Sequence, residues 1–333
     1  MVYKSKFILF TLSLLLVCST FAWGAEPGEL PGVASNDLQA GGVRPGSILL
    51  YNLYSSSASE ANHNTQISLT NTHTTRNAIV HLFFIDGATC AVADAFACLT
   101  PNQTASFLAS EVDPGTTGYI LAVASNRETG APIGFNFLIG SEYVKLPTGH
   151  AAKLPAESIA ANFEGAFPLP TVTAAEAQLK FNGRQYGRLP RVLALDEIGS
   201  LADRNHTLLV LNSPGGNLAT GATPFRGFYG VLYDDAENAY SFLQPVGKCQ
   251  FIVRSLSDDF PRTTPAFTQA IPTGRTGWMR LWAASERPLT GAAIRLNRND
   301  EDSPRAFNGG ANLHHLRMAE AATLTIPVFQ PAC

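Results

Sequence analysis

Alternation of apolar and polar residues is the dominant pattern along this chain of 333 residues. In residues 65–71, Ile67 and Leu69 alternate with polar residues, as in a strand with one buried and one solvated face. Other short segments are rich in β-branched and aromatic residues and are bounded by Gly, Pro, Asn, Asp or Ser. These predicted strands cover residues 48–54, 65–71, 78–85, 104–109, 118–124, 133–139, 206–212, 227–233, 250–254, 277–283, 292–296 and 324–329.

The close spacing of these strands predicts an all-β protein. Long helical patterns do not alternate with the strands, which favours antiparallel sandwiches over an α/β fold. We therefore expect two tandem immunoglobulin-like antiparallel β-sandwich domains joined by a Pro-rich linker.

A faint internal repeat supports the expectation of two related units. Residues 117–125 and 276–285 both begin with Thr-Gly, continue as an aromatic-led strand and end at Ser, and a second Thr-Gly follows each of them. A repeat of this length indicates a duplicated domain rather than a solenoid unit. The alternative is that β-rich sequences share such turns by composition alone. Upstream, Asn64-Thr65 resembles His206-Thr207 in the same order.

The N-terminus has the pattern of a secretory signal peptide. Lys4 and Lys6 precede an apolar run at residues 7–17, and small residues follow. Cleavage after Ala22 and cleavage after Gly24 both fit. A membrane anchor is the alternative, but the run is shorter than the roughly 18–20 residues that span a bilayer. We expect a secreted, periplasmic or cell-surface protein without a transmembrane span in the mature chain.

The region between the two predicted domains is rich in proline. Three prolines of this region precede Thr171, and Pro155 could begin a short helix over residues 155–161. The expected organisation is a signal peptide at 1–24, a flexible leader at 25–45, a first sandwich at 46–153, a linker with this short helix at 154–190 and a second sandwich at 191–333.

Charge is sparse in this chain, which argues against a nucleic-acid partner. Charged residues make up 15% of the sequence and the net charge is −3. Phosphate-backbone binding depends on clustered Lys and Arg, whereas the arginines here are scattered among acids. Thr, Ser, Asn and Gly supply the polar share instead, as is typical of extracellular β-proteins.

Four cysteines lie outside the predicted signal peptide: Cys90, Cys98, Cys249 and Cys333. An even number in an oxidising compartment indicates two disulfides. We favour Cys90 with Cys98, because a gap of this length can close across a hairpin, and hence Cys249 with Cys333. The alternative is four buried free thiols.

Sequence motifs for common catalytic sites are absent. The chain has no Gly-x-Ser-x-Gly, no His-Glu-x-x-His, no Cys-x-x-Cys and no phosphate-binding Gly-rich loop ending in Lys-Ser or Lys-Thr. We therefore predict no catalytic residue and no cofactor. His73 and His81 could supply two metal ligands from neighbouring strands, but no third ligand is identifiable, and a solvated pair is favoured.

Two acidic loops are candidate calcium sites. Asp300 and Asp302 belong to one loop, and Asp234 and Asp235 end a predicted strand. Neither loop has alternate-residue ligands closed by a bidentate Glu. Solvated turns are therefore the favoured interpretation.

Aromatic residues are candidates for a carbohydrate-binding face, because flat rings stack on sugars. Trp278 and Trp282 share one face of a predicted strand, and such a pair in a sandwich is usually core. Core packing is therefore favoured for the candidates, which are Tyr119, Tyr229, Tyr233, Trp278 and Trp282.

The sequence favours a non-enzymatic secreted or surface-exposed protein with an adhesion, envelope-structural or ligand-binding role. Its partner would be an extracellular ligand such as a polysaccharide or a protein. The alternative is a secreted hydrolase with a polar site between the two domains. That site would combine Asp86, Asp94 and Glu111 with Asp234 or His206.

Overall fold

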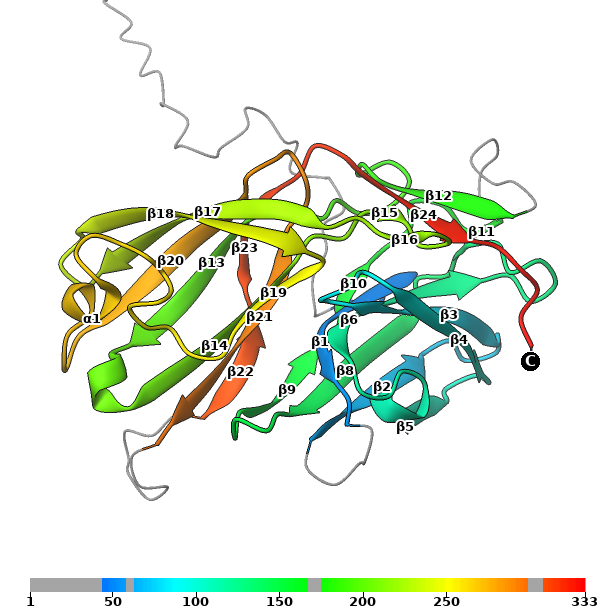
Figure 1. Ribbon diagram of the computed structural model, residues 1–333. Coiled ribbons are helices and arrows are strands. Elements are labelled where there is room, and N and C mark those ends of the chain that lie inside the picture. The colour runs from blue at the N-terminus through cyan, green and yellow to red at the C-terminus, as the bar shows by residue number, and fades with distance from the viewer. Residues whose placement is uncertain (1–43, 58–62, 167–174, 299–307, 333) are drawn as a thin grey trace, which may run out of the picture.

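β-Strands dominate the computed structural model, which describes residues 44–57, 63–166, 175–298 and 308–332 (Figure 1). The predicted signal peptide and nearly all of the predicted leader lie outside these residues and stay predictions. The helices within the described residues are short: η1 (Ala109–Glu111), η2 (Leu201–Asp203) and α1 (Phe267–Ala270).

The first part of the chain contributes a five-stranded and a four-stranded antiparallel sheet. The five-stranded sheet has the order β10-β1-β6-β3-β4, with β1 (Ile48–Ser55), β3 (Ala78–Asp86), β4 (Val92–Leu99), β6 (Thr117–Ser125) and β10 (Glu157–Ile159). The four-stranded sheet has the order β5-β2-β8-β9, with β2 (Asn64–Asn71), β5 (Thr104–Leu108), β8 (Leu138–Lys145) and β9 (Ala151–Pro155).

The later part of the chain repeats this pair of sheets. Its five-stranded sheet has the order β18-β17-β20-β13-β23, with β13 (Pro190–Gly199), β17 (Phe225–Asp234), β18 (Ala239–Lys248), β20 (Thr276–Ala283) and β23 (His314–Met318). Its four-stranded sheet has the order β19-β14-β21-β22, with β14 (Asn205–Asn212), β19 (Gln250–Val253), β21 (Thr290–Asn297) and β22 (Gly309–Asn312).

Matching strand orders relate these two pairs of sheets. The two five-stranded sheets have equivalent strand orders: β1 corresponds to β13, β6 to β20, β3 to β17 and β4 to β18. The repeated sequences at residues 117–125 and 276–285 form β6 and β20, which occupy the centre of each sheet. The other repeated pair, Asn64-Thr65 and His206-Thr207, begins β2 and β14.

A further sheet combines segments from distant parts of the chain. It has the order β12-β24-β15-β16, and β15 pairs with β24 in parallel. Its strands are β12 (Glu176–Phe181), β15 (Gly216–Asn217), β16 (Gly221–Ala222) and β24 (Ala322–Pro327), and a two-stranded sheet joins β7 (Ile133–Gly134) to β11 (Gly165–Ala166). Residues far apart in sequence therefore share hydrogen-bonded sheets.

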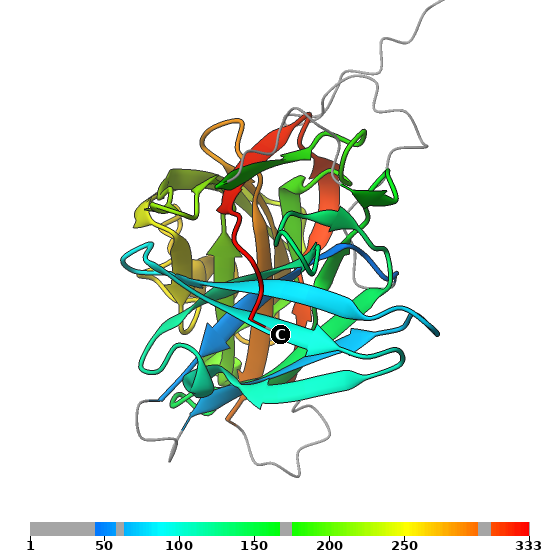
Figure 2. The same cartoon turned by 90° about the vertical axis from the view of Figure 1, so that its right-hand side faces the viewer.

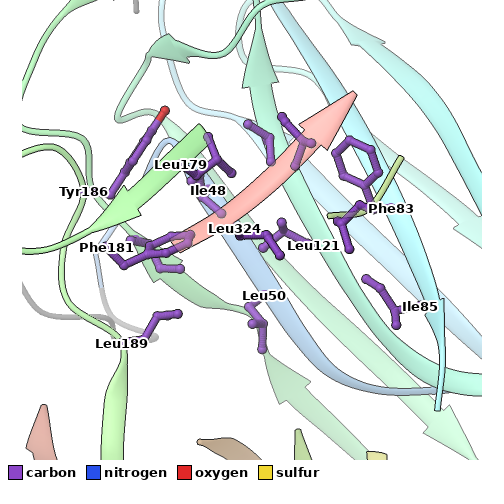
Figure 3. Packing of buried hydrophobic residues seen from close by; sticks show 14 of the residues in the cluster. Ile48, Leu50, Phe83, Ile85, Leu121, Leu179, Phe181, Tyr186, Leu189 and Leu324 are labelled. Carbon is purple, nitrogen blue, oxygen red and sulfur yellow. The ribbon is translucent and has the colours of Figure 1, made fainter. Parts of the chain in front are cut away.

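Apolar clusters connect the sheets in succession. β1, β3 and β6 pack against β12 and β24 through one face (Figure 3) and against β2 and β8 through the other. β8 and β9 contact β14 and β21, whose opposite face packs on β13, β17 and β20. Met318 of β23 reaches the cluster formed by β12 and β24. The chain is arranged as a five-bladed β-propeller with small sheets.

The expectation of two tandem immunoglobulin-like sandwich domains is therefore wrong, although the all-β class is confirmed. The reason is that β1 is buried along its whole length, on both faces, so that apolar packing continues beyond a two-layer unit. The alternation of apolar and polar residues indicates which face of a strand is buried, but it does not show how many further sheets pack on that strand. The domain boundaries predicted at residues 46–153 and 191–333 stay predictions.

The predicted linker contains strands where a short helix was expected. β9 ends at Pro155, and β10 follows over Glu157–Ile159 and pairs with β1. β12 lies in the same region and pairs along its length with β24. Proline content suggested an irregular segment, but pairing with distant strands supplies partners for its backbone groups.

Candidate functional site

The outer face of the sheet β18-β17-β20-β13-β23 carries a group of aromatic residues. In β20, Met279 and Leu281 are fully buried against the core, while Trp278, Arg280 and Trp282 are only half-buried. Successive side chains of a strand point to opposite faces of the sheet. The two tryptophans therefore lie on the face that is turned away from the core.

Each tryptophan stacks on a tyrosine of the neighbouring strand β17. Trp282 is opposite Tyr229, with ring centroids 6.1 Å apart and an interplanar angle of 27°. Trp278 is opposite Tyr233, with centroids 4.5 Å apart and an angle of 10°. Cross-strand aromatic pairs of this kind each contribute roughly 0.2–1 kcal/mol to a sheet. The two pairs place four aromatic rings on the same face of the sheet.

Polar and apolar side chains complete this surface. Arg280 lies between the two pairs, and its guanidinium carbon is 5.7 Å from the Trp278 ring centroid. Leu243 of β18 is opposite Tyr229 and is 54% exposed. Ser241 lies two residues before Leu243 on the same strand and points to the same face. We call this surface the aromatic face; it consists of Tyr229, Tyr233, Ser241, Leu243, Trp278, Arg280 and Trp282.

The prediction that the aromatic candidates pack in the core is right for Tyr119 and wrong for the tryptophans. Tyr119 is buried in the cluster between β6 and the sheet of β12 and β24. Both alternating sets of β20 contain large apolar residues, but Arg280 belongs to the set with the tryptophans, and this charged residue is the local signal that the set faces outward. The set with Met279 and Leu281 faces inward, and the larger rings face outward.

The predicted pairing of the cysteines is also wrong. Cys90 forms a disulfide with Cys249, 159 residues away in sequence. Cys98 is also disulfide-bonded, and Cys333 lies outside the described residues. Cys90 follows the turn after β3 and Cys98 lies within β4, where it is opposite Ile79 of β3. In the hairpin of β3 and β4, Cys98 therefore lies beside Ile79 and not beside Cys90.

The candidate calcium ligands that the structure describes belong to a hydrogen-bonded turn. Asp234 accepts hydrogen bonds from the backbone N–H groups of Ala236 and Asn238, from the Asn238 side chain and from the Tyr240 hydroxyl. The Asn238 side chain and the other donors lower the pKa of Asp234 to about 2. Asp235 forms an ion pair with Arg275. Asp300 and Asp302 lie outside the described residues.

The histidines considered as metal ligands have separate surroundings. His73 Nδ1 accepts hydrogen bonds from the backbone N–H groups of Thr75 and Arg76. His81 is fully buried, contacts Asp94 at 3.0 Å and stacks on Phe96. Burial lowers the pKa of His81 against the opposing effect of Asp94. Within the described ranges, no cluster of three or more His, Cys, Asp or Glu could hold a metal ion.

The residues of the hydrolase hypothesis are distributed over different elements. Asp86 caps the turn after β3, Asp94 binds His81, and Glu111 lies in η1. Asp234 lies at the end of β17, and His206 near the start of β14 contacts Ser255. In the described part of the chain, no hydrogen bond or ion pair joins any two of these five residues.

A buried polar cluster between the two pairs of sheets was not anticipated from the sequence. The Asn52 side chain donates to Glu157 Oε1 at 2.7 Å, and Asn212 donates to the Asn52 carbonyl at 2.9 Å. Gln250 donates to the Asn212 side chain, and His315 pairs with Glu157 at 3.1 Å. These residues look like ordinary strand polar positions in the sequence, because nothing local indicates their burial.

Among the residues described, no helix has the length and apolarity needed to cross a membrane. No protein-family model matches this chain, and a search of curated proteins finds no relative of it.

Proposed function

We propose that this chain is an exported, non-enzymatic carbohydrate-binding protein that binds a polysaccharide on its aromatic face. The observation that carries the proposal is the presence of two Tyr-Trp pairs on one solvent-facing sheet surface. Large aromatic side chains are normally buried, so a contiguous group of them that is half-buried, with Tyr229 exposed, indicates a binding surface.

The chemistry of this surface suits sugars. The C–H faces of a pyranose ring pack on flat aromatic rings, and the hydroxyl groups at its edges need hydrogen-bonding partners. The aromatic face offers both kinds of contact, because Arg280 and Ser241 lie between the aromatic pairs. Trp278 and Trp282 are four residues apart, so the pairs are separated by about 13 Å along the strand. An extended oligosaccharide can contact both.

Export is the second part of the proposal. Support comes from the N-terminal pattern of Lys4 and Lys6 followed by an apolar run, and from the disulfide between Cys90 and Cys249. Disulfides persist in oxidising compartments. Polysaccharides of cell surfaces and extracellular matrices are available to a protein in that location.

The test compares two tyrosines of nearly equal exposure on different sheets. Tyr229 is 42% exposed on the aromatic face, and Tyr143 is 40% exposed on the sheet of β5, β2, β8 and β9. Binding of the purified mature protein to a panel of soluble polysaccharides would be measured by affinity electrophoresis and calorimetry. We expect Y229A to weaken binding about tenfold, since stacking contributes on the order of 1 kcal/mol beyond buried area.

The Y143A variant should bind like the wild type. If Y229A and Y143A bind all polysaccharides equally well, or if none of the panel binds to the wild type, the proposal is wrong. Unfolding of each variant in urea would show that the fold is intact.

A further inference from the structure

A second site lies at one end of the layer between the sheet of β13 and β20 and the sheet of β14 and β21. Here the structure has a cavity of about 530 Å³, a size typical of small-molecule sites. β13 contributes Glu197, β14 contributes His206 and Thr207, β20 contributes Thr276, and β21 contributes Arg295. The cavity is separate from the surface residues that form the aromatic face.

The Thr207 side chain is the least expected part of the cavity wall. Thr207 is only 3% exposed, yet it lines the cavity. Its hydroxyl makes no hydrogen bond with any other residue in the described part of the chain. The hydroxyl is not one of the solvent-excluded polar atoms without a partner, so it is open to the cavity that Thr207 lines. A ligand in the cavity would supply the missing partner.

The repeated sheet gives an internal comparison for this threonine. Thr65 at the start of β2 matches Thr207 in the sequence repeat, and it is also fully buried. Its hydroxyl accepts a hydrogen bond from the Ser55 backbone N–H at 2.9 Å and donates to the Ser55 carbonyl at 3.1 Å. Thr65 is opposite Val144, whereas Thr207 is opposite Arg295. The second sheet pair therefore has a polar opening where the first is closed.

Charges around the cavity favour an uncharged ligand. Arg295 donates to the Asp196 carboxylate at 2.7 Å and is 3.8 Å from Glu197. Its Nε atom is buried and has no hydrogen-bond partner within the described residues. The two carboxylates would repel an anion, and the guanidinium would repel a cation. Hydroxyl groups can accept from Arg295 and donate to Glu197 at once.

The backbone at Glu197 is also unusual. Its φ is +47°, in the left-handed region that non-glycine residues seldom adopt. Glu197 lies where the pairing of β13 with β20 shifts register between Leu195 and Ile198. This bulge directs an acidic side chain to the cavity mouth, where it is 80% exposed. Bulges often redirect a side chain beside a functional site.

We propose that this cavity binds a neutral, polyhydroxylated small molecule, such as a monosaccharide or a polyol. Thr207 and Arg295 contact its hydroxyl groups from the inner wall, and Glu197 accepts a hydrogen bond at the mouth. The proposal does not depend on the aromatic face, because it rests on residues that the polysaccharide does not touch.

The experiment measures binding to the full mature protein by saturation-transfer NMR and calorimetry. The probes are glucose, mannose, N-acetylglucosamine and glycerol as neutral compounds, and acetate and ethylamine as charged ones. We expect at least one neutral compound to bind. T207V should weaken that binding about three- to tenfold, which corresponds to one hydrogen bond.

T65V and Y229A are the matched controls. T65V should lower the melting temperature, because Ser55 loses both hydrogen bonds, and should leave binding of the small molecule unchanged. T207V removes a hydroxyl without a protein partner and should keep the melting temperature. If T207V unfolds, T276V at the exposed rim replaces it, with the same expected direction.

Three results would overturn the proposal. They are the absence of binding by every neutral probe, preferential binding of a charged probe, and equal affinity of the wild type and the Thr207 or Thr276 variant. Loss of small-molecule binding in Y229A would assign the signal to the aromatic face instead. Failure of polysaccharide binding alone would contradict the proposed function and leave this site intact.

Discussion

At the scale of single residues, Glu142 shows how burial changes the chemistry of a side chain. This carboxyl on β8 is completely buried and accepts the backbone N–H of Leu53 at 3.1 Å. It also interacts with the backbone N–H of Asn52. Both donors lie where the pairing of β1 with β6 shifts register between Tyr51 and Tyr54. Glu142 therefore satisfies backbone groups that the bulge leaves without a ladder partner.

Burial raises the pKa of Glu142 well above its usual value, and the nearby Glu157 raises it further. The unfolded chain exposes Glu142, so its carboxyl has an ordinary pKa there. The folded protein thus binds this proton more tightly. The stability that the protonated Glu142 carboxyl contributes is complete below the pKa of the unfolded chain. It is lost as the pH rises through the raised pKa of the folded protein.

We predict that E142Q reduces this pH dependence. The free energy of unfolding of the wild type should fall as the pH rises from about 4.5, the usual carboxyl pKa, toward 8. E142Q keeps a carbonyl acceptor and has no proton to lose, so it should be more stable than the wild type at pH 8. E142A should lose about 1–3 kcal/mol, because buried N–H groups lose their acceptor. Urea unfolding at several pH values measures all three, and parallel curves for the wild type and E142Q would refute the assignment.

At the scale of elements, the sequence predicted about half of the 24 strands in the described residues and not all of their orientations; β4, β13 and β18 are among the strands that it missed. β20 was expected at residues 277–283 and is found at Thr276–Ala283. Its tryptophans were assigned to the core because of their size, and they lie outside on the face that also carries Arg280. β12 could not be identified, since its alternation is short and its partner β24 is distant in sequence. A local sequence pattern can locate a strand, but it does not identify the strands that pair with it.

The two faces of β20 should respond differently to truncation. L281A should reduce the free energy of unfolding by about 2–5 kcal/mol, because a fully buried side chain leaves a cavity. W282A should cost about 1 kcal/mol, since it removes a half-buried ring and its stacking on Tyr229. Urea unfolding of both variants measures the difference. A larger loss for W282A would mean that the outward orientation of the tryptophans is wrong.

At the scale of the whole molecule, the packing of sheets was the least predictable feature. The sequence indicates apolar strands, and it even shows the repeat that relates β6 to β20. It does not show that β1 is covered on both faces, or that the segment after β24 crosses the sheet of β3 and β4 (Figure 2). There Phe329 packs on His81 at 5.0 Å between ring centroids. Such contacts depend on distant residues, which no local pattern encodes.

The candidate sites follow the same rule. The sequence identified Trp278, Trp282 and the two tyrosines as aromatic candidates, so the residues of the aromatic face were visible but their exposure was not. The cavity at Thr207 was not visible, because it depends on the absence of a hydrogen bond that its counterpart Thr65 makes. Residue type is local information, whereas satisfaction of a polar group requires the fold.

The disulfide between Cys90 and Cys249 provides a test of the whole arrangement. It joins the turn after β3 to the start of β19 and closes a loop with a sequence separation of 159 residues. Backbone hydrogen bonds join the same segments, since Gly87 accepts from the N–H groups of Cys249 and Gln250. We expect these bonds to keep the two segments in contact when the disulfide is absent.

We therefore expect the double variant C90S/C249S to fold and to be less stable. Chain entropy predicts a loss of about 4–5 kcal/mol for a loop of this length, and removal of natural disulfides typically costs about 2–5 kcal/mol. Urea unfolding measures the loss. The native bond should resist mild reductant, because Cys90 and Cys249 are 6% and 1% exposed. Peptide mapping without reduction should recover Cys90 linked to Cys249; recovery of Cys90 linked to Cys98 would contradict the arrangement of the sheets around this bond.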